Sequence, residues 1–90
     1  MYYRIVFVRS RVPFSERASY LERLNAAAAA DKYDPGRAYI PSSCADYEIV
    51  VCSKCPVASR LYNNDLRAIF RELKKRGCEI TDEAGTRFTR

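Results

Sequence analysis

The sequence of 90 residues contains no histidine, no tryptophan, three glycines and one methionine. Histidine is the commonest general base near neutral pH, so its absence excludes the Ser-His and Cys-His arrangements of nucleophilic catalysis. The three glycines stand at positions 36, 77 and 85, and none fits a phosphate-binding loop. Neighbouring carboxylates, such as Asp82 and Glu83, fall in predicted turns. We therefore predict that the protein is not an enzyme and has no cofactor.

Long apolar runs are also missing. The run from Ala26 to Ala30 is among the longest, whereas a membrane-spanning helix needs about 20 apolar residues. The N-terminus lacks the basic lead-in and the small-residue cleavage site of a secretory signal. We expect one compact domain over residues 1–90, no membrane association and a cytoplasmic location, where thiols stay reduced unless they bind metal or do redox work.

The first third of the chain predicts a strand and a helix. Tyr2–Arg9 is rich in aromatic and β-branched residues and is apolar on both faces in its middle, which favours a central strand. Ser15 is a helix-capping residue, so the helix should run from about Glu16 to about Asp31. Its predicted buried stripe consists of Phe14, Ala18, Leu21 and Ala28.

The middle of the chain predicts two short strands and a second helix. Residues 37–40 and 46–52 are close enough in sequence to form a hairpin. The second helix should begin at a cap on Asn63 or Asn64 and end before Gly77, which follows a cationic last turn. Its apolar stripe contains Tyr62, Leu66, Ile69, Phe70 and Leu73.

The C-terminal part completes the fold prediction. Residues 78–81 are expected to form a strand, and 82–85 a turn in which Gly85 adopts a positive φ. An extra C-terminal strand at 86–89 is left open. The element order β-α-β-β-α-β predicts an α+β, ferredoxin-like two-layer sandwich, with one antiparallel sheet and both helices on one face.

Four cysteines, Cys44, Cys52, Cys55 and Cys78, are many for this length. Only Cys52 and Cys55 have the spacing of a zinc knuckle, so a four-cysteine zinc site requires Cys44 and Cys78 to converge on them. The same pair has the spacing of a redox motif, but Pro56 and the late helix cap separate it from the helix start. We interpret Cys52 and Cys78 as small buried residues, with Cys55 exposed.

The formal net charge is +5 at pH 7, which favours an acidic partner. Residues 1–30 and 56–90 each carry +3, and residues 31–55 carry −1. Basic side chains recur at spacings of seven, four and three along one side of the second helix, where a solvated face also carries charge. These residues are Arg60, Arg67, Arg71 and Lys74.

Seven tyrosines accompany the arginines, and both residue types are enriched in protein–protein hot spots. The predicted partner-binding residues are Arg60, Arg67, Arg71, Lys74, Tyr2 and Tyr47. We therefore expect a non-enzymatic protein that binds and blocks, or regulates, an acidic or nucleic-acid-handling protein. In its small size and lack of motifs the chain resembles phage-encoded inhibitors, anti-CRISPR proteins among them, and that resemblance implies a blocking role.

Two alternatives remain open. One is direct binding of single-stranded nucleic acid by aromatic residues on the sheet face that the helices leave uncovered. Val6–Ser10 resembles the first-strand motif of RNA recognition domains, whereas Asp46–Ser53 lacks the glycine and aromatic pattern of their third strand. The other alternative is a zinc-stabilised or redox-active CxxC domain.

Overall fold

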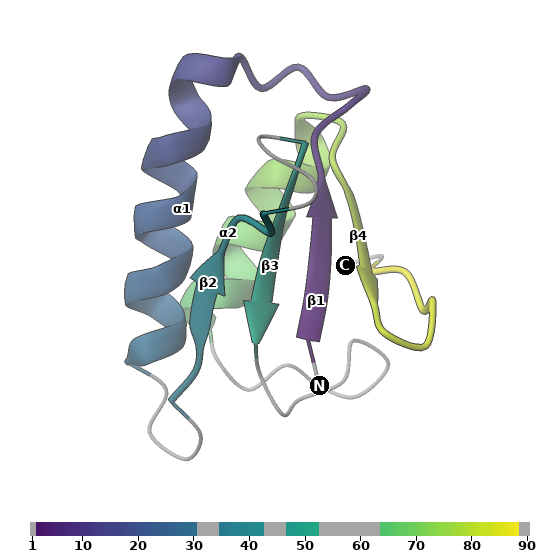
Figure 1. The fold of residues 1–90 in the computed structure, drawn as a ribbon. Coiled ribbons are helices and arrows are strands. Elements are labelled where there is room, and N and C mark those ends of the chain that lie inside the picture. Colours follow the sequence, from purple (N-terminus) through teal and green to yellow (C-terminus); the bar gives the residue numbers. More distant parts are fainter. Residues whose placement is uncertain (1, 31–34, 43–46, 53–63, 89–90) are drawn as a thin grey trace.

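A computed structural model describes residues 2–30, 35–42, 47–52 and 64–88 (Figure 1). Within them the elements follow the order β1 (Tyr2–Val6), α1 (Phe14–Ala29), β2 (Arg37–Tyr39), β3 (Glu48–Cys52), α2 (Asn64–Lys75) and β4 (Glu79–Asp82). The prediction of an α+β protein with two helices and an antiparallel sheet is therefore confirmed.

The four strands form one open sheet in the order β2-β3-β1-β4, and every neighbouring pair is antiparallel. The central position expected for the first strand is confirmed, because β1 lies between β3 and β4. Figure 1 shows both helices against the same face of the sheet. None of the described helices is long and apolar enough to cross a membrane.

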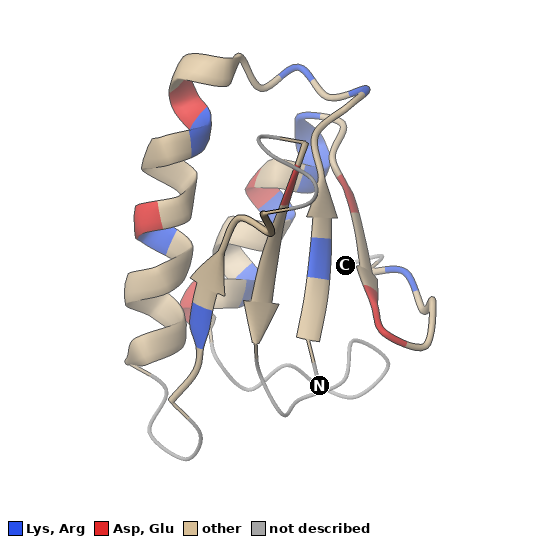
Figure 2. Ribbon diagram, viewed as in Figure 1, with Lys and Arg blue, Asp and Glu red and all other residues tan. Residues whose placement is uncertain are grey.

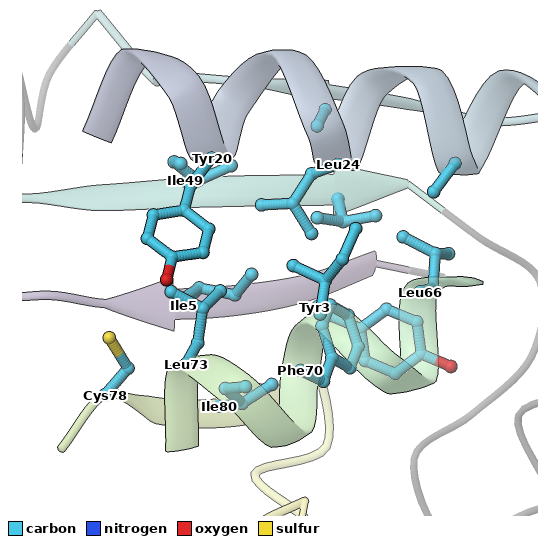
Figure 3. Packing of buried hydrophobic residues seen from close by; sticks show 14 of the residues in the cluster. Tyr3, Ile5, Tyr20, Leu24, Ile49, Leu66, Phe70, Leu73, Cys78 and Ile80 are labelled. Atoms are coloured by element: carbon cyan, nitrogen blue, oxygen red, sulfur yellow. The ribbon is translucent and has the colours of Figure 1, made fainter. Parts of the chain in front are cut away.

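The core lies between this sheet face and the helices (Figure 3). Tyr3, Ile5, Ile49, Val51 and Ile80 point from the strands toward the helices and are buried. The stripe predicted for α2 is confirmed for its described members, since Leu66, Ile69, Phe70 and Leu73 are all buried; Tyr62 is outside the described residues. Tyr3 meets Phe70 edge-on at 5.3 Å between ring centroids, a geometry that aromatic pairs favour.

The start and the buried stripe of α1 differ from the prediction. The helix begins at Phe14, because Pro13 stands before it in an extended conformation and its carbonyl accepts the N–H of Glu16 at 3.0 Å. Ser15 is therefore inside the helix and is not the cap. The buried residues are Tyr20, Leu24, Ala27 and Ala28, whereas Phe14 and Ala18, predicted to be buried, are exposed.

The free edge of β2 is covered by α1, which runs beside it (Figure 1). The N–H of Ala38 donates to the Asn25 side-chain oxygen at 3.1 Å, and the N–H of Gly36 donates to the Ala28 carbonyl at 2.8 Å. A Cβ on residue 36 would lie 1.9 Å from the Cys52 carbonyl oxygen, so this close approach requires glycine. These two backbone donors on the edge of β2 are thus already paired.

The turn after β4 follows the prediction. Gly85 has a φ of 84° and donates its N–H to the Asp82 carbonyl at 3.0 Å. The Asp82 carboxylate accepts the N–H groups of Ala84 and Thr86, both at 2.9 Å. These hydrogen bonds to its carboxylate explain why the Asp82 side chain can be buried although it carries charge.

The extra C-terminal strand does not form within the described residues. The chain returns beside β4, but only Thr81 and Arg87 form an isolated bridge. Phe88 donates its N–H to the Ile80 carbonyl at 2.8 Å, and its buried ring packs edge-on against Phe70 at 5.5 Å. Ring burial, together with the turn held by Asp82, keeps this segment in place without a full strand ladder.

Candidate binding surface

The end of the molecule where β1 stops is built from two distant parts of the chain, residues 7–17 and 74–78, which we call the basic end. After Val6 the backbone turns, and both the N–H and the hydroxyl of Ser10 donate to the Phe7 carbonyl, at 2.9 and 2.8 Å. The predicted strand therefore ends three residues early. The N–H of Arg11 then donates to the Arg76 carbonyl at 2.7 Å, which joins the loop to the end of α2.

Side chains strengthen this connection. The Arg11 guanidinium donates to the Lys75 carbonyl at 3.1 Å, where the last turn of α2 leaves carbonyl groups without helical partners. The Arg76 guanidinium pairs with the Glu16 carboxylate and donates to the Tyr20 hydroxyl at 3.1 Å and to the Arg11 carbonyl at 3.3 Å. The hydrogen bond and charge of Arg76 lower the pKa of Glu16. Arg76 and Arg11 therefore hold the loop in place.

Arg17 is held between two aromatic rings. Its guanidinium carbon lies 5.2 Å from the ring centre of Phe7 and 5.7 Å from that of Phe14. Phe7 is buried, whereas Phe14 is 63% exposed. Cations within about 6 Å of a ring are attracted to its face, so this contact fixes the direction of both Arg17 and Phe14.

The two segments of the basic end carry the entire formal charge of the chain. They contain six of the 16 basic residues and one of the 11 acids, so the remaining residues hold ten of each sign. Figure 2 shows the basic residues on the loop after β1 and at the adjoining end of α2. Among the described residues, Arg9 and Lys75 have no ion-pair partner and are exposed. Their charges are available to a ligand.

A shallow hollow of about 310 Å³ lies beside Arg9. Its lining residues are Val6, Val8, Arg9, Gly77 and Glu79. Val8 is 61% exposed, so an apolar side chain faces solvent next to a free cation. This combination is typical of the edge of a protein-binding surface.

The structure only partly gathers the residues predicted to bind a partner. Arg67, Arg71 and Lys74 lie along one side of α2, opposite the side where Glu72 pairs with Arg23 of α1 at 2.8 Å. The Lys74 ammonium donates a hydrogen bond to the Phe88 carbonyl, so this side chain already has a partner within the protein.

The other predicted residues lie elsewhere. Tyr2 is on the sheet face opposite the helices, and Tyr47 precedes β3 and is 60% exposed. Arg60 lies outside the described residues. The six residues therefore do not form one described surface.

The two described cysteines of the candidate metal set, Cys52 and Cys78, do not converge either. Cys52 pairs with Tyr2 at one end of the sheet, whereas Cys78 precedes Glu79, which pairs with Val6 at the other end. Four residues of strand separate these positions by about 13 Å, too far for one zinc ion with bonds of about 2.3 Å. Cys44 and Cys55 lie outside the described residues.

The two described thiols differ in their surroundings. Cys78 is a free, buried thiol, as predicted, and its burial raises its pKa. Cys52 is free and partly buried at the end of β3, so the prediction of burial holds only in part for this residue.

The four strands contribute balanced charge to the sheet face without helices. It presents Tyr2, Arg4, Val6, Arg37, Tyr39, Glu48, Val50, Cys52, Glu79 and Thr81. Arg4 pairs with Glu48 at 3.2 Å, and the Arg37 guanidinium lies over the Tyr39 ring at 4.9 Å. The strands thus place two cations beside two carboxylates, and Arg87, bridged to Thr81, adds one cation at this edge. This excess of one charge gives less attraction for phosphates than the +5 of the basic end, so the charge distribution favours the basic end.

Comparison of the chain with protein families, with curated proteins and with solved structures found no match.

Proposed function

We propose that the protein is a non-enzymatic binding protein that contacts an acidic protein partner through its basic end, and that this contact blocks or regulates the partner. The observation that carries the proposal is the concentration of the whole formal charge of +5 in residues 7–17 and 74–78. Such a field attracts and orients an acidic partner. A partner that handles nucleic acid fits where it presents an acidic surface of its own, since its polyanion-binding site would be basic and would repel the basic end.

The local structure supports a binding role. Arg11 and Arg76 fix the loop, while Arg9 and Lys75 remain exposed beside it. A surface that is fixed before binding loses less conformational freedom when the partner arrives. The absence of histidine from the sequence supports the non-enzymatic assignment.

We further infer that the fold is ferredoxin-like. The strand order β2-β3-β1-β4, with α1 following β1 and α2 following β3, supports this assignment. We also infer a cytoplasmic location, which the free thiols of Cys52 and Cys78 support.

Charge reversal at the basic end tests the binding proposal. The test variant combines Arg9→Glu with Lys75→Glu, and the control combines Arg37→Glu with Arg87→Glu, which changes the net charge equally. Arg37 lies at the opposite end of the sheet, and Arg87 beside the middle of β4. The probe is a fluorescent peptide of twelve glutamates, and binding is followed by fluorescence anisotropy.

We expect the test variant to bind the probe roughly tenfold more weakly than the control, because close charge pairs are lost and replaced by repulsion. Circular dichroism establishes that both variants fold. Equal weakening by the two variants would show that the overall charge matters and the basic end does not, which contradicts the proposal. In extracts of the cell that encodes the protein, the physiological partner should be retained by the control and lost by the test variant.

A further inference from the structure

Two exposed apolar side chains lie in the segments that carry the net charge. Phe14 is 63% exposed and Val8 is 61% exposed. The other large hydrophobic residues exposed in the described part of the chain are Tyr2, Tyr39 and Tyr47, each of which has a polar hydroxyl. Within the described part of the chain, Phe14 and Val8 are thus the exposed large side chains that have no polar group, and both belong to the basic end.

Phe14 is held in its exposed position. Pro13 fixes the backbone before it, and the guanidinium of Arg17 lies against its ring while also contacting the buried ring of Phe7. The Phe14 ring therefore does not need to be ordered when a partner binds. Pre-organised aromatic residues beside arginine are the usual composition of binding hot spots.

Val8 offers a second apolar contact of a different shape. It borders the hollow that Val6, Arg9, Gly77 and Glu79 complete. The apolar wall can cover a small aliphatic side chain, while Arg9 pairs with a carboxylate next to it. Glu79 also lines this hollow, and its negative charge disfavours any anion inside it, so a carboxylate that pairs with Arg9 must lie at the rim.

We propose that the basic end binds an acidic protein segment that carries apolar side chains among its carboxylates, and that Phe14 and Val8 contact those apolar side chains. This inference rests on the proposed function and names the chemistry of the partner segment. Cations alone select for negative charge of any origin. The two apolar contacts add a requirement that a bare polyanion does not meet.

Three fluorescent probes separate these requirements. The first is a twelve-residue peptide of nine acidic residues and three interspersed leucines, and the second replaces the leucines with serines. The third is a twelve-nucleotide oligothymidylate. At about 150 mM salt, where exposed charges are screened beyond about 8 Å, we expect the leucine peptide to bind roughly tenfold more tightly than the serine peptide.

Variants at the two apolar residues locate this preference. Phe14→Ser and Val8→Ser should each reduce the affinity for the leucine peptide while leaving the affinity for the serine peptide unchanged. Phe14→Leu keeps an apolar side chain and should retain most of the preference. Because Phe14 and Val8 are exposed, the serine variants should fold, and circular dichroism with thermal unfolding checks this.

The outcomes distinguish the two proposals. Equal affinities for the two peptides overturn the inference, as does a preference for the leucine peptide that both serine variants retain. Tighter binding of the oligothymidylate, or of vesicles containing phosphatidylserine, assigns the surface to another class of ligand and also overturns it. The proposed function fails separately, if neither acidic peptide binds or if both bind the Arg9→Glu, Lys75→Glu variant as well as the unchanged protein.

Discussion

Arg9 and Arg76 carry the same charge at the same end of the molecule, but their surroundings assign them different roles. Arg76 is surrounded by acceptors from α1 and from the loop, and its pKa is raised by the hydrogen bond to Glu16. Arg9 has no such partner among the described residues and borders the hollow. Counting basic residues alone would treat them as equivalent, whereas only Arg9 is available for a ligand.

The Arg76–Glu16 pair makes a prediction about pH. The lowered pKa of Glu16 means that the pair stabilises the folded state above 4.5, the ordinary value, and loses this effect as pH falls through the lowered pKa. In Arg76→Gln the pKa of Glu16 should return toward 4.5. The unfolding temperature of this variant should be below that of the unchanged protein at pH 7, and the difference should narrow well below pH 4.5 to the part that comes from the hydrogen bonds to Tyr20 and Arg11.

Carbon-detected NMR titration of the Glu16 carboxyl group measures the first effect, and thermal unfolding at several pH values measures the second. Arg9→Gln is the matched control, since it removes an exposed guanidinium that has no partner among the described residues. It should leave the Glu16 titration unchanged. An unaltered Glu16 pKa in Arg76→Gln would contradict the role given to this arginine.

Among the elements, β2 combines a short strand with an edge that α1 protects. Exposed strand edges are sites where further strands add, and proteins commonly cover them. Here Asn25 supplies the acceptor for the Ala38 N–H, and the helix backbone supplies one for Gly36. One polar side chain on α1 therefore influences both stability and the tendency to self-associate.

Asn25→Ala tests this influence. Losing the hydrogen bond should lower the free energy of unfolding by about 1 kcal/mol and increase self-association as the concentration rises. Asn25→Asp keeps a side-chain acceptor and should behave more like the unchanged protein. Urea unfolding and sedimentation velocity measure the two effects. If Asn25→Ala and Asn25→Asp have the same stability and remain monomeric alike, the edge does not depend on this contact.

The two helices differ in how far their sequences predict them. In α2, large apolar residues occur only at helical spacing and are separated by charges, so the buried stripe is unambiguous. In α1 the alanines are compatible with either face, and Phe14 stands at the first turn, where the helix extends past the sheet (Figure 1). Its apolar character predicted burial, but at that position there is no sheet for it to cover.

The basic end shows a different limit of sequence reasoning. Its arginines and lysines lie in two segments about sixty residues apart, and periodicity within α2 predicted Arg67, Arg71 and Lys74, of which only Lys74 belongs to the basic end. The sequence did show excess positive charge in both terminal thirds, and the structure brings parts of these thirds together because β1 pairs with β4. Which cations pair and which stay free depends on side-chain geometry that residue spacing does not contain.

At the scale of the whole molecule, the basic end carries the net positive charge, and the remaining residues together carry no net formal charge. The molecule measures 32 × 23 × 22 Å, whereas exposed charges are screened beyond about 8 Å at physiological ionic strength and beyond about 30 Å at 0.01 M salt. Charges at the far end of the molecule should therefore not affect the affinity for a bound acidic segment at physiological salt. They should affect it when salt is low.

This difference predicts how the control variant responds to salt. With the leucine peptide, Arg37→Glu, Arg87→Glu should bind like the unchanged protein at 150 mM salt and more weakly at 10 mM. Arg9→Glu, Lys75→Glu should bind more weakly at both concentrations. Anisotropy titrations across the salt range provide the measurement. Weakening of the control at 150 mM salt would mean that the peptide extends well beyond the basic end.

The connections that hold the basic end also determine when it can exist during synthesis. Arg11 bonds to Lys75 and Arg76 bonds to Glu16, across separations of 64 and 60 residues. A nascent chain folds from its N-terminal side as the ribosome extends it, so the loop after β1 emerges long before the end of α2 that fixes it. A nascent chain that lacks residues 75 and 76 cannot form the contacts that hold the proposed binding surface. The proposed recognition can therefore begin only once residues 74–78 have left the ribosome.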